Sequence, residues 1–186
     1  MTDRRIVLKS ESELARMRRA GRIVAQVLAA LAEMARPGLT TAALDARAAE
    51  LTARLGGVPS FKGYNGFPAS ICVSLNEEVV HGIPGPRRLA EGDLVSLDFG
   101  AIYDGYQADA ALTVAIGTIT PEAERLLQIT REALERGIAA AREGNRLSAI
   151  GRAVQEHVEA AGFSVVRDLV GHGIGQQMHE PPQVPN

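Results

Sequence analysis

The sequence has few of the features that mark secreted, membrane or nucleic-acid-binding proteins. Its 186 residues include no tryptophan and only one cysteine, Cys72. A single cysteine excludes a disulfide framework within the chain. No apolar run approaches the roughly 18 residues of a membrane-spanning helix, and the N-terminus carries no apolar signal stretch. The net charge of -2 gives no sign of a nucleic-acid partner. We therefore predict a cytoplasmic protein without membrane or nucleic-acid partners.

The length suits a single domain over residues 1–186, built from two similar halves. At an offset of 106 residues, 35–38 aligns with 141–144, and positions in the helices that follow also align. Because self-similar units bury a shared core, we predict a first pseudo-repeat at about 11–118 and a second at about 119–186. Chance similarity between alanine-rich helices is the alternative. The first unit's hairpin has no counterpart in the second, which predicts that the second is truncated.

Apolar spacing and capping residues predict four amphipathic helices. The first follows a capping box formed by Ser10 and Glu13, and the third follows Thr120 with a proline at the first helical position. The predicted ranges are about 11–34, 41–55, 121–143 and 148–161. The third helix is expected to turn one apolar side inward (Leu126, Ile129, Ala133, Leu134 and Ile138). Residues 70–75 and 163–170 are predicted to form strands.

A hairpin is predicted over residues 94–116. Asp104 and Gly105 separate two alternating apolar runs, and Asp-Gly is a favoured filling of a two-residue type I′ turn. With those residues as the loop, Tyr103 faces Tyr106. One face of the pair then carries alternating apolar side chains and belongs in a core.

The other face of this hairpin carries two acids. Asp98 faces Ala111 and Asp109 faces Gly100, so the two aspartates are diagonal neighbours with Cα atoms roughly 7 Å apart. Two carboxylates this close repel each other unless one takes up a proton or a cation lies between them. A solvated polar face is the alternative, because one face of an antiparallel sheet is often wet.

Further candidate side chains lie in loops. His172 stands between glycines in the segment GHGIG, and His179 follows seven residues later. Carboxylate and neutral imidazole suit manganese, iron, cobalt or zinc, so Asp98, Asp109 and His172 are a plausible ligand set. The loop at 58–69 holds clustered aromatic residues that predict a lid or a pocket wall.

Three blocks of the chain together resemble the type I methionine aminopeptidases: YNGFPASICVSLNEEVVHGIP (64–84), LVSLDFGAIYDGYQADAALT (94–113) and GHGIGQQMHEPP (171–182). The resemblance implies the pita-bread fold, a pseudo-twofold α+β arrangement with a curved antiparallel sheet covered by helices. It also implies a hydrolase that removes the initiator methionine from nascent proteins. Water activated by one or two divalent metal ions (Co, Mn, Fe or Zn) would cleave the first peptide bond.

The resemblance also implies roles for individual residues. Asp98, Asp109 and His172 match metal ligands, and Asp109 is expected to bridge two metals. His179 matches a catalytic histidine that contacts the scissile amide, and His81 one near the substrate amine. The methionine pocket would be lined by Tyr64, Phe67, Cys72 and Met178. Phe67 and Met178 differ from the aromatic residues that the family often has there.

One departure affects activity. The family has two further glutamate ligands in strands after the GHGIG block, and no residue of this chain matches them. The chain is therefore expected to be a truncated form that lacks a C-terminal segment, binds metal weakly and exposes a sheet edge. A prolidase or aminopeptidase P relative and a non-catalytic module that binds polypeptide ends or ribosomal surfaces are the alternatives.

Overall fold

The computed structural model describes residues 6–186, which form two compact units. The first, here the sheet unit, comprises Leu8–Ile119 and the short segment Ile174–Met178. The second, here the helix-pair unit, comprises Thr120–Gly173 and His179–Asn186 together with Ile6 and Val7. Each unit is described by itself.

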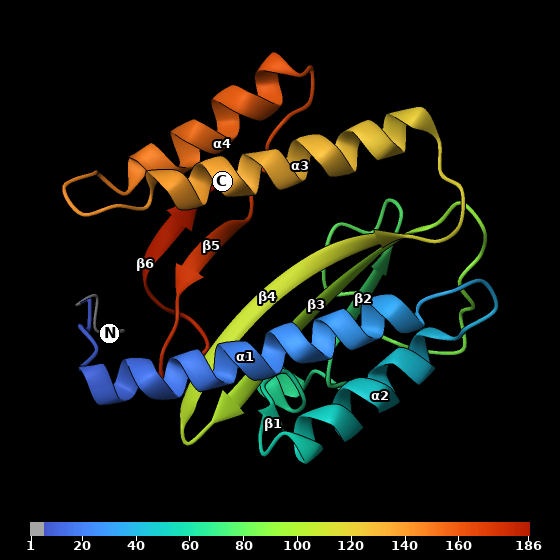
Figure 1. Cartoon of the computed structure of the whole chain (residues 1–186), viewed down its shortest axis with the longest axis horizontal. Helices are drawn as coiled ribbons and strands as arrows, with labels where there is room; N and C mark the ends of the chain where they lie inside the picture. The colour runs from blue at the N-terminus through green and yellow to red at the C-terminus, as the bar shows by residue number, and fades with distance from the viewer. Residues whose placement is uncertain (1–5) are drawn as a thin grey trace. The chain divides into compact units, whose positions relative to one another are not determined.

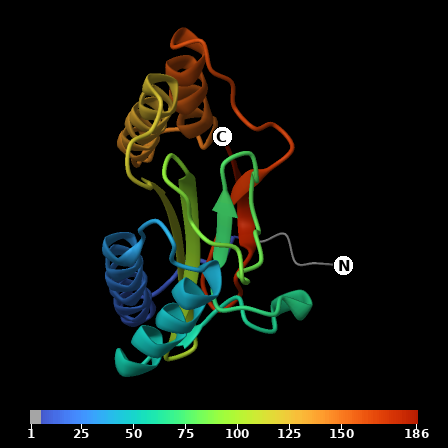
Figure 2. The ribbon, with the colours of Figure 1, turned by 90° about the vertical axis from the view of Figure 1, so that its right-hand side faces the viewer.

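The sheet unit places two helices against one antiparallel sheet. Its elements in order are α1 (Glu11–Met34), α2 (Thr41–Arg54), β1 (Val58–Pro59), the 3₁₀ turn η1 (Tyr64–Gly66), β2 (Cys72–Leu75), β3 (Leu94–Tyr103) and β4 (Tyr106–Ala115). Within the described residues, β1 and β2 both pair with one side of β3, and β4 pairs with the other. Helices α1 and α2 lie on one face of this sheet (Figures 1 and 2).

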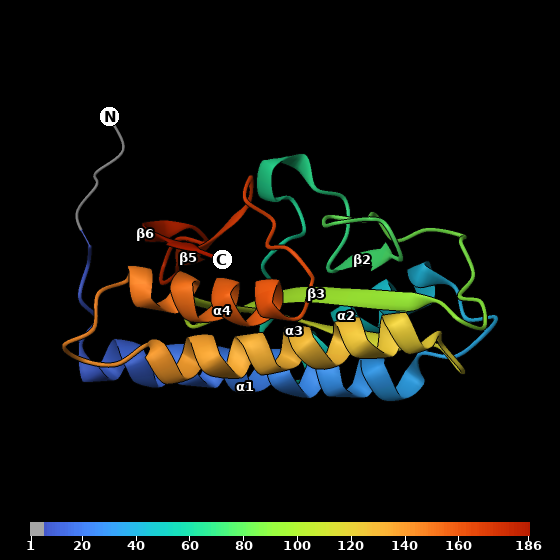
Figure 3. The same cartoon turned by 90° about the horizontal axis from the view of Figure 1, so that it is seen from above.

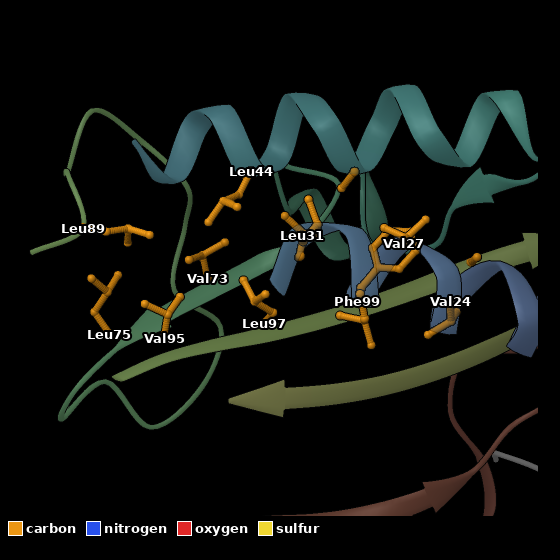
Figure 4. Close-up of a cluster of buried hydrophobic side chains, with 14 of the residues drawn as sticks. Val24, Val27, Leu31, Leu44, Val73, Leu75, Leu89, Val95, Leu97 and Phe99 are labelled. Carbon is orange, nitrogen blue, oxygen red and sulfur yellow. The ribbon is translucent and has the colours of Figure 1, made fainter. Parts of the chain in front are cut away.

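The core of the sheet unit forms between those helices and the apolar face of the hairpin. Val95, Leu97 and Phe99 of β3 are fully buried, as the alternation predicted. They pack against side chains from α1, α2, β2 and the loop that precedes β3 (Val24, Val27, Leu31, Leu44, Val73, Leu75 and Leu89), as Figure 4 shows. Because strand side chains alternate between faces, the neighbours of these residues in β3 point away from the helices.

The start of α1 confirms the predicted capping box. The backbone N–H of Glu13 donates to the Ser10 hydroxyl, and the backbone N–H of Ser10 donates to the Glu13 carboxylate at 2.7 Å. This reciprocal pair satisfies two N–H groups that have no partner within the helix. It fixes where α1 begins, and thereby where its first turn meets β4.

The helix-pair unit contains α3 (Pro121–Ala140), α4 (Ser148–Ala160), β5 (Val170–Gly173) and β6 (Glu180–Pro185). The two helices lie side by side (Figure 3), and β5 pairs with β6. The predicted inward side of α3 is largely wrong: Ala133 is buried, but Leu126, Leu134 and Ile138 are exposed. Periodicity identifies an apolar stripe, and no described residue covers this part of it.

The predicted strand at 163–170 is also wrong, because only Val170 belongs to a strand. An extended segment needs a partner for its backbone groups. Here the carbonyls of Val166 and Leu169 accept hydrogen bonds from the side-chain amide of Asn186 instead. No described helix is both long and apolar enough to cross a membrane.

Candidate active site

The turn between β3 and β4 sets the register that brings two acids together. Asp104 and Gly105 have φ values of 47° and 76°, as a type I′ turn requires, and Tyr103 pairs with Tyr106. Asp98 pairs with Ala111 and Gly100 with Asp109. The predicted hairpin and its register are therefore confirmed.

A hydrogen bond between the two carboxyl groups favours the protonated form of Asp98. Burial, followed by the charge of Asp109, raises the pKa of Asp98 from its ordinary 3.8 to about 7. A pair held in this way takes up a proton near neutral pH, and it releases that proton to solvent when a cation binds in its place. The sheet thus places two neighbouring carboxyl groups on the face opposite the core, and carboxylates are ligands that suit divalent cations.

Cys72 lies beside this pair, because β2 sets it opposite Asp98 in the sheet. Burial, then the charges of Asp98 and Asp109, raise the pKa of the Cys72 thiol to about 12. The thiol therefore stays protonated, which suits an apolar wall better than a nucleophile or metal ligand.

An apolar cluster forms around Cys72. It contains Phe61, Cys72 and Met178, all buried, with Phe67 packed partly against them. The rings of Phe61 and Phe67 meet edge to face at 6.5 Å. Cys72, Phe67 and Met178 were predicted pocket residues, whereas Phe61 was not. Gly100 makes room for the Phe61 ring, because a Cβ there would lie 2.8 Å from it, and no local sequence pattern indicates this contact.

Two other residues that were predicted to contact the substrate lie at the surface: Tyr64 of the predicted pocket and His81, predicted near the substrate amine. Tyr64 is 40% exposed in η1 and is not part of the cluster. His81 is exposed and has φ 62°, an uncommon conformation for histidine outside functional or tight-turn positions. The next residue, Gly82, is held against β2, because its carbonyl accepts from Val73 N and its N–H donates to Ser74 Oγ. The loop thus presents His81 on a fixed backbone.

The two histidines of the GHGIG region lie together in the helix-pair unit. The rings of His172 and His179 have centroids 4.2 Å apart. Nδ1 of His172 lies 2.9 Å from the carbonyl oxygen of Gly173, which can only accept. Nδ1 therefore carries the proton and Nε2 the lone pair, and a backbone carbonyl on the other ring nitrogen is the usual arrangement for a metal-binding histidine.

Side chains that were predicted to act together are thus gathered in three groups: the acid pair, the histidine pair and the apolar cluster. Within residues 6–186 no three metal-ligating side chains form one cluster. Asp98 and Asp109 belong to the sheet unit and His172 to the helix-pair unit. The complete ligand set therefore stays a prediction.

Comparison with known proteins adds the family. The model of metallopeptidase family M24 matches residues 15–186. The chain belongs to metallopeptidase family M24. A methionine aminopeptidase from Clostridium acetobutylicum is 53% identical over 182 residues, which cover 97% of this chain and 73% of that protein. The crystal structure of methionine aminopeptidase from Thermotoga maritima matches with a TM-score of 0.96 and 42% identity, covering 98% of this chain and 74% of the other.

Other M24 proteins share the fold at lower identity. Prolidase from Pyrococcus furiosus matches with a TM-score of 0.83 and 23% identity, over 96% of this chain and 52% of that one. The predicted pita-bread fold is confirmed by these neighbours. Since identity is so much higher toward methionine aminopeptidases, the prolidase alternative is not favoured.

The residues present fit the divalent metal ions that membership of M24 implies. Two carboxylates that carry a shared proton can exchange it for a cation, because cation and proton relieve the same repulsion. A neutral imidazole with its lone pair on Nε2 is a suitable third donor.

Proposed function

We propose that the chain is a cytoplasmic, metal-dependent methionine aminopeptidase that removes the N-terminal methionine of newly made proteins. The observation that carries the proposal is the acid pair of Asp98 and Asp109, held by the hairpin on one sheet face. The similarity to methionine aminopeptidases over nearly the whole chain supports the same conclusion.

In this proposal Asp98, Asp109 and His172 would hold up to two divalent ions (Co, Mn, Fe or Zn). The bound ions would supply Lewis acidity and lower the pKa of a water molecule. His179 would donate a hydrogen bond to the scissile amide as charge develops on it. Both carboxyl groups must lose their shared proton before a cation binds, which makes loading depend on pH.

The methionine side chain would enter the apolar cluster of Phe61, Phe67, Cys72 and Met178. A thioether is apolar and flexible, and it packs well against aromatic rings and sulfur. The protonated Cys72 adds no charge to this wall. His81 and Tyr64, which are exposed on neighbouring loops, would contact the substrate amine and the rim of the pocket.

We also infer that a further polypeptide segment completes the enzyme. The repeat supports this: α1 and α3 end at Met34 and Ala140, a spacing of 106 residues, as do α2 and α4 at Arg54 and Ala160. In the first repeat a sheet follows the helices. Along the outer edge of β4, Ala111 and Thr113 have no neighbouring strand within residues 6–186. The added segment would supply the two glutamate ligands implied by the resemblance.

Hydrolysis of the peptide Met-Gly-Met with added Mn²⁺ or Co²⁺ tests the proposal. With the completing segment supplied from a relative, Asp109→Asn should reduce turnover by at least about a hundredfold, because it removes the charge of a metal ligand. Asp104→Asn is the matched control, since that residue is 69% exposed at the turn and Asn-Gly also fills a type I′ turn.

Three results would contradict the proposal. Turnover that persists in Asp109→Asn would remove the metal assignment. Cleavage of an Xaa-Pro peptide in preference to Met-Gly-Met would place the chain with the prolidases. Binding of Met-Gly-Met without cleavage, even after the missing segment is supplied from a relative, would indicate a non-catalytic module.

A further inference from the structure

The loop between β5 and β6 links the two histidines of the proposed site. Gly173 pairs with Glu180 across the two strands, so residues 174–179 close the hairpin. Segment Ile174–Met178 belongs to the sheet unit. His172 precedes it by two residues, within roughly 7 Å along the chain, and His179 directly follows it. Whatever fixes this segment therefore limits where both imidazoles can lie.

Gln107 holds the segment through its backbone and its side chain. Its N–H donates to the carbonyl of Gly175 at 2.8 Å, and its Nε2 donates to the carbonyl of Gln176 at 3.0 Å. Gly175 is buried although its neighbour Gln176 is exposed. Two successive carbonyls of the loop are therefore fixed by one residue near the start of β4.

Tyr106 adds a second fixed point. Its hydroxyl accepts a hydrogen bond from Nε2 of Gln176 at 3.0 Å and donates one to Glu13. The guanidinium of Arg16 lies 4.5 Å from the centre of the Tyr106 ring, and the residue is 2% exposed. The hydrogen bond from Tyr106 lowers the pKa of Glu13 to about 2, so that carboxylate stays an acceptor at neutral pH.

Met178 fixes the other end of the segment. It is buried in the cluster with Phe61 and Cys72. The segment is thus held at Gly175 and Gln176 by polar contacts and at Met178 by packing, which leaves little freedom for the peptide next to His179.

We propose that Tyr106 and Gln107 are positioning residues that orient His172 and His179 by fixing the loop between them. This inference rests on the roles proposed above for those two histidines. Neither Tyr106 nor Gln107 touches the reacting atoms. Their effect passes through three hydrogen bonds to the loop and then along the chain to the imidazoles.

Gln107→Leu and Tyr106→Phe separate this role from a structural one. Oε1 of Gln107 is buried and has no hydrogen-bond partner within residues 6–186, so a leucine there removes an unsatisfied group and should cost little stability. Phenylalanine at 106 keeps the ring under Arg16 and removes only the hydroxyl contacts. Tyr103→Phe is the matched control, because Tyr103 faces Tyr106 across the same turn and its ring also lies under an arginine, Arg19.

The first measurement is the NMR titration of the chain's four histidines without metal. Gln107→Leu and Tyr106→Phe should shift or broaden the ring Cε1–H signals of His172 and His179. The signals of His81 and His157 should stay in place, as should all four in Tyr103→Phe. Unchanged His172 and His179 signals in both variants would overturn the proposal, and so would equal changes at all four histidines.

The second measurement is hydrolysis of Met-Gly-Met with Mn²⁺. Loss of a group that orients a catalytic or ligand histidine costs about 10–100-fold in activity or metal affinity. Each variant should therefore lower kcat about tenfold with KM within twofold, while Tyr103→Phe stays within twofold of the original chain. If no form hydrolyses the peptide even with the completing segment supplied from a relative, the proposed function fails while the histidine spectra still decide the positioning role. An active chain whose kcat is unchanged by both variants would refute that role alone.

Discussion

The two units begin with the same local structures and end with very different interiors. Each has a long helix followed by a shorter one, and the helices end at equivalent positions. In the sheet unit the helices lie on a sheet and bury a continuous apolar core. In the helix-pair unit the buried side chains are few and small, while large apolar ones on α3 remain exposed (Leu126, Leu134 and Ile138).

The difference shows what a helix pair needs. An amphipathic helix is stable when a second layer covers its apolar stripe. For α1 and α2 that layer is the sheet with Phe99 and Leu97 on its inner face. For α3 the described residues supply only part of such a second layer. Stability is thus expected to be concentrated in the sheet unit, together with the acid pair that this unit builds.

The largest expected effect is a cavity in the sheet unit. Phe99→Ala should lower the free energy of unfolding by about 3–5 kcal/mol, because a fully buried ring is removed and the site cannot collapse around the gap. Leu134→Ala, on the exposed stripe of α3, should change it by less than about 0.5 kcal/mol. Urea titrations followed by circular dichroism measure both. Similar losses in the two variants would contradict the contrast between the units.

The second effect is a pH dependence that arises at the acid pair. The pKa of Asp98 is raised to about 7 in the folded protein, so folding favours its protonated form. The protonated Asp98 therefore contributes to the free energy of unfolding in full below pH 4, and this contribution is lost as the pH rises through 7. At about 1.4 kcal/mol per pKa unit, the full change is on the order of 2–4 kcal/mol. Comparing metal-free wild type with Asp98→Asn between pH 4 and 8 measures it, and the curve of the variant should be flatter.

The affinity for a metal ion should change with pH in the opposite direction, rising as the pH rises. Mn²⁺ competes with the shared proton, so its affinity should fall up to about tenfold for each pH unit below 7. Isothermal titration calorimetry at pH 6, 7 and 8 measures the change, with Asp104→Asn as control. An affinity that does not depend on pH would mean that the cation binds elsewhere.

The third effect concerns the exposed stripe. Leu134→Lys combined with Ile138→Lys should leave stability within about 1 kcal/mol, because both side chains already lie in water. The pair should lower binding of the dye ANS and any self-association, since it breaks an apolar surface. Val79→Lys, on an exposed loop of the sheet unit, is the control and should have a smaller effect. If the double variant unfolds the chain, the stripe is covered after all.

The sequence was most informative where local chemistry decides the structure. The Asp104-Gly105 turn determined a register of pairs along both strands and thereby the acid pair. The capping box at Ser10 determined the start of α1. In each case a few adjacent residues determine the backbone.

It failed where partners from elsewhere decide. The period of α3 revealed an apolar stripe but not whether anything covers Leu134 and Ile138. Residues 163–170 are rich in strand-forming side chains, but among residues 6–186 no strand pairs with 163–169. Phe61 entered the apolar cluster because Gly100 leaves room for its ring, a long-range fit that no local pattern encodes. For the same reason the distance from Asp98 to His172 cannot be derived from spacing.

The smallest expected effect tests the repeat itself. Gly38 and Gly144 occupy equivalent positions after α1 and α3, with φ values of 84° and 86°. In both, a Cβ would meet nothing within 4 Å, so the cost of alanine comes from the left-handed backbone alone. Gly38→Ala and Gly144→Ala should each destabilise their own unit by about 1 kcal/mol. Hydrogen exchange of amides in α1 and α3 measures the two units separately.

Gly85→Ala serves as the control, because a Cβ there also meets nothing but φ is not positive. It should be neutral or slightly stabilising. Equal destabilisation by the two substitutions would mean that the same left-handed turn ends the long helix in both repeats. The result would then not depend on how much of each helix is covered by a second layer. A cost at Gly38 but none at Gly144 would mean that the turn after α3 relaxes when substituted. The similarity between the halves would then be one of sequence and not of local energetics.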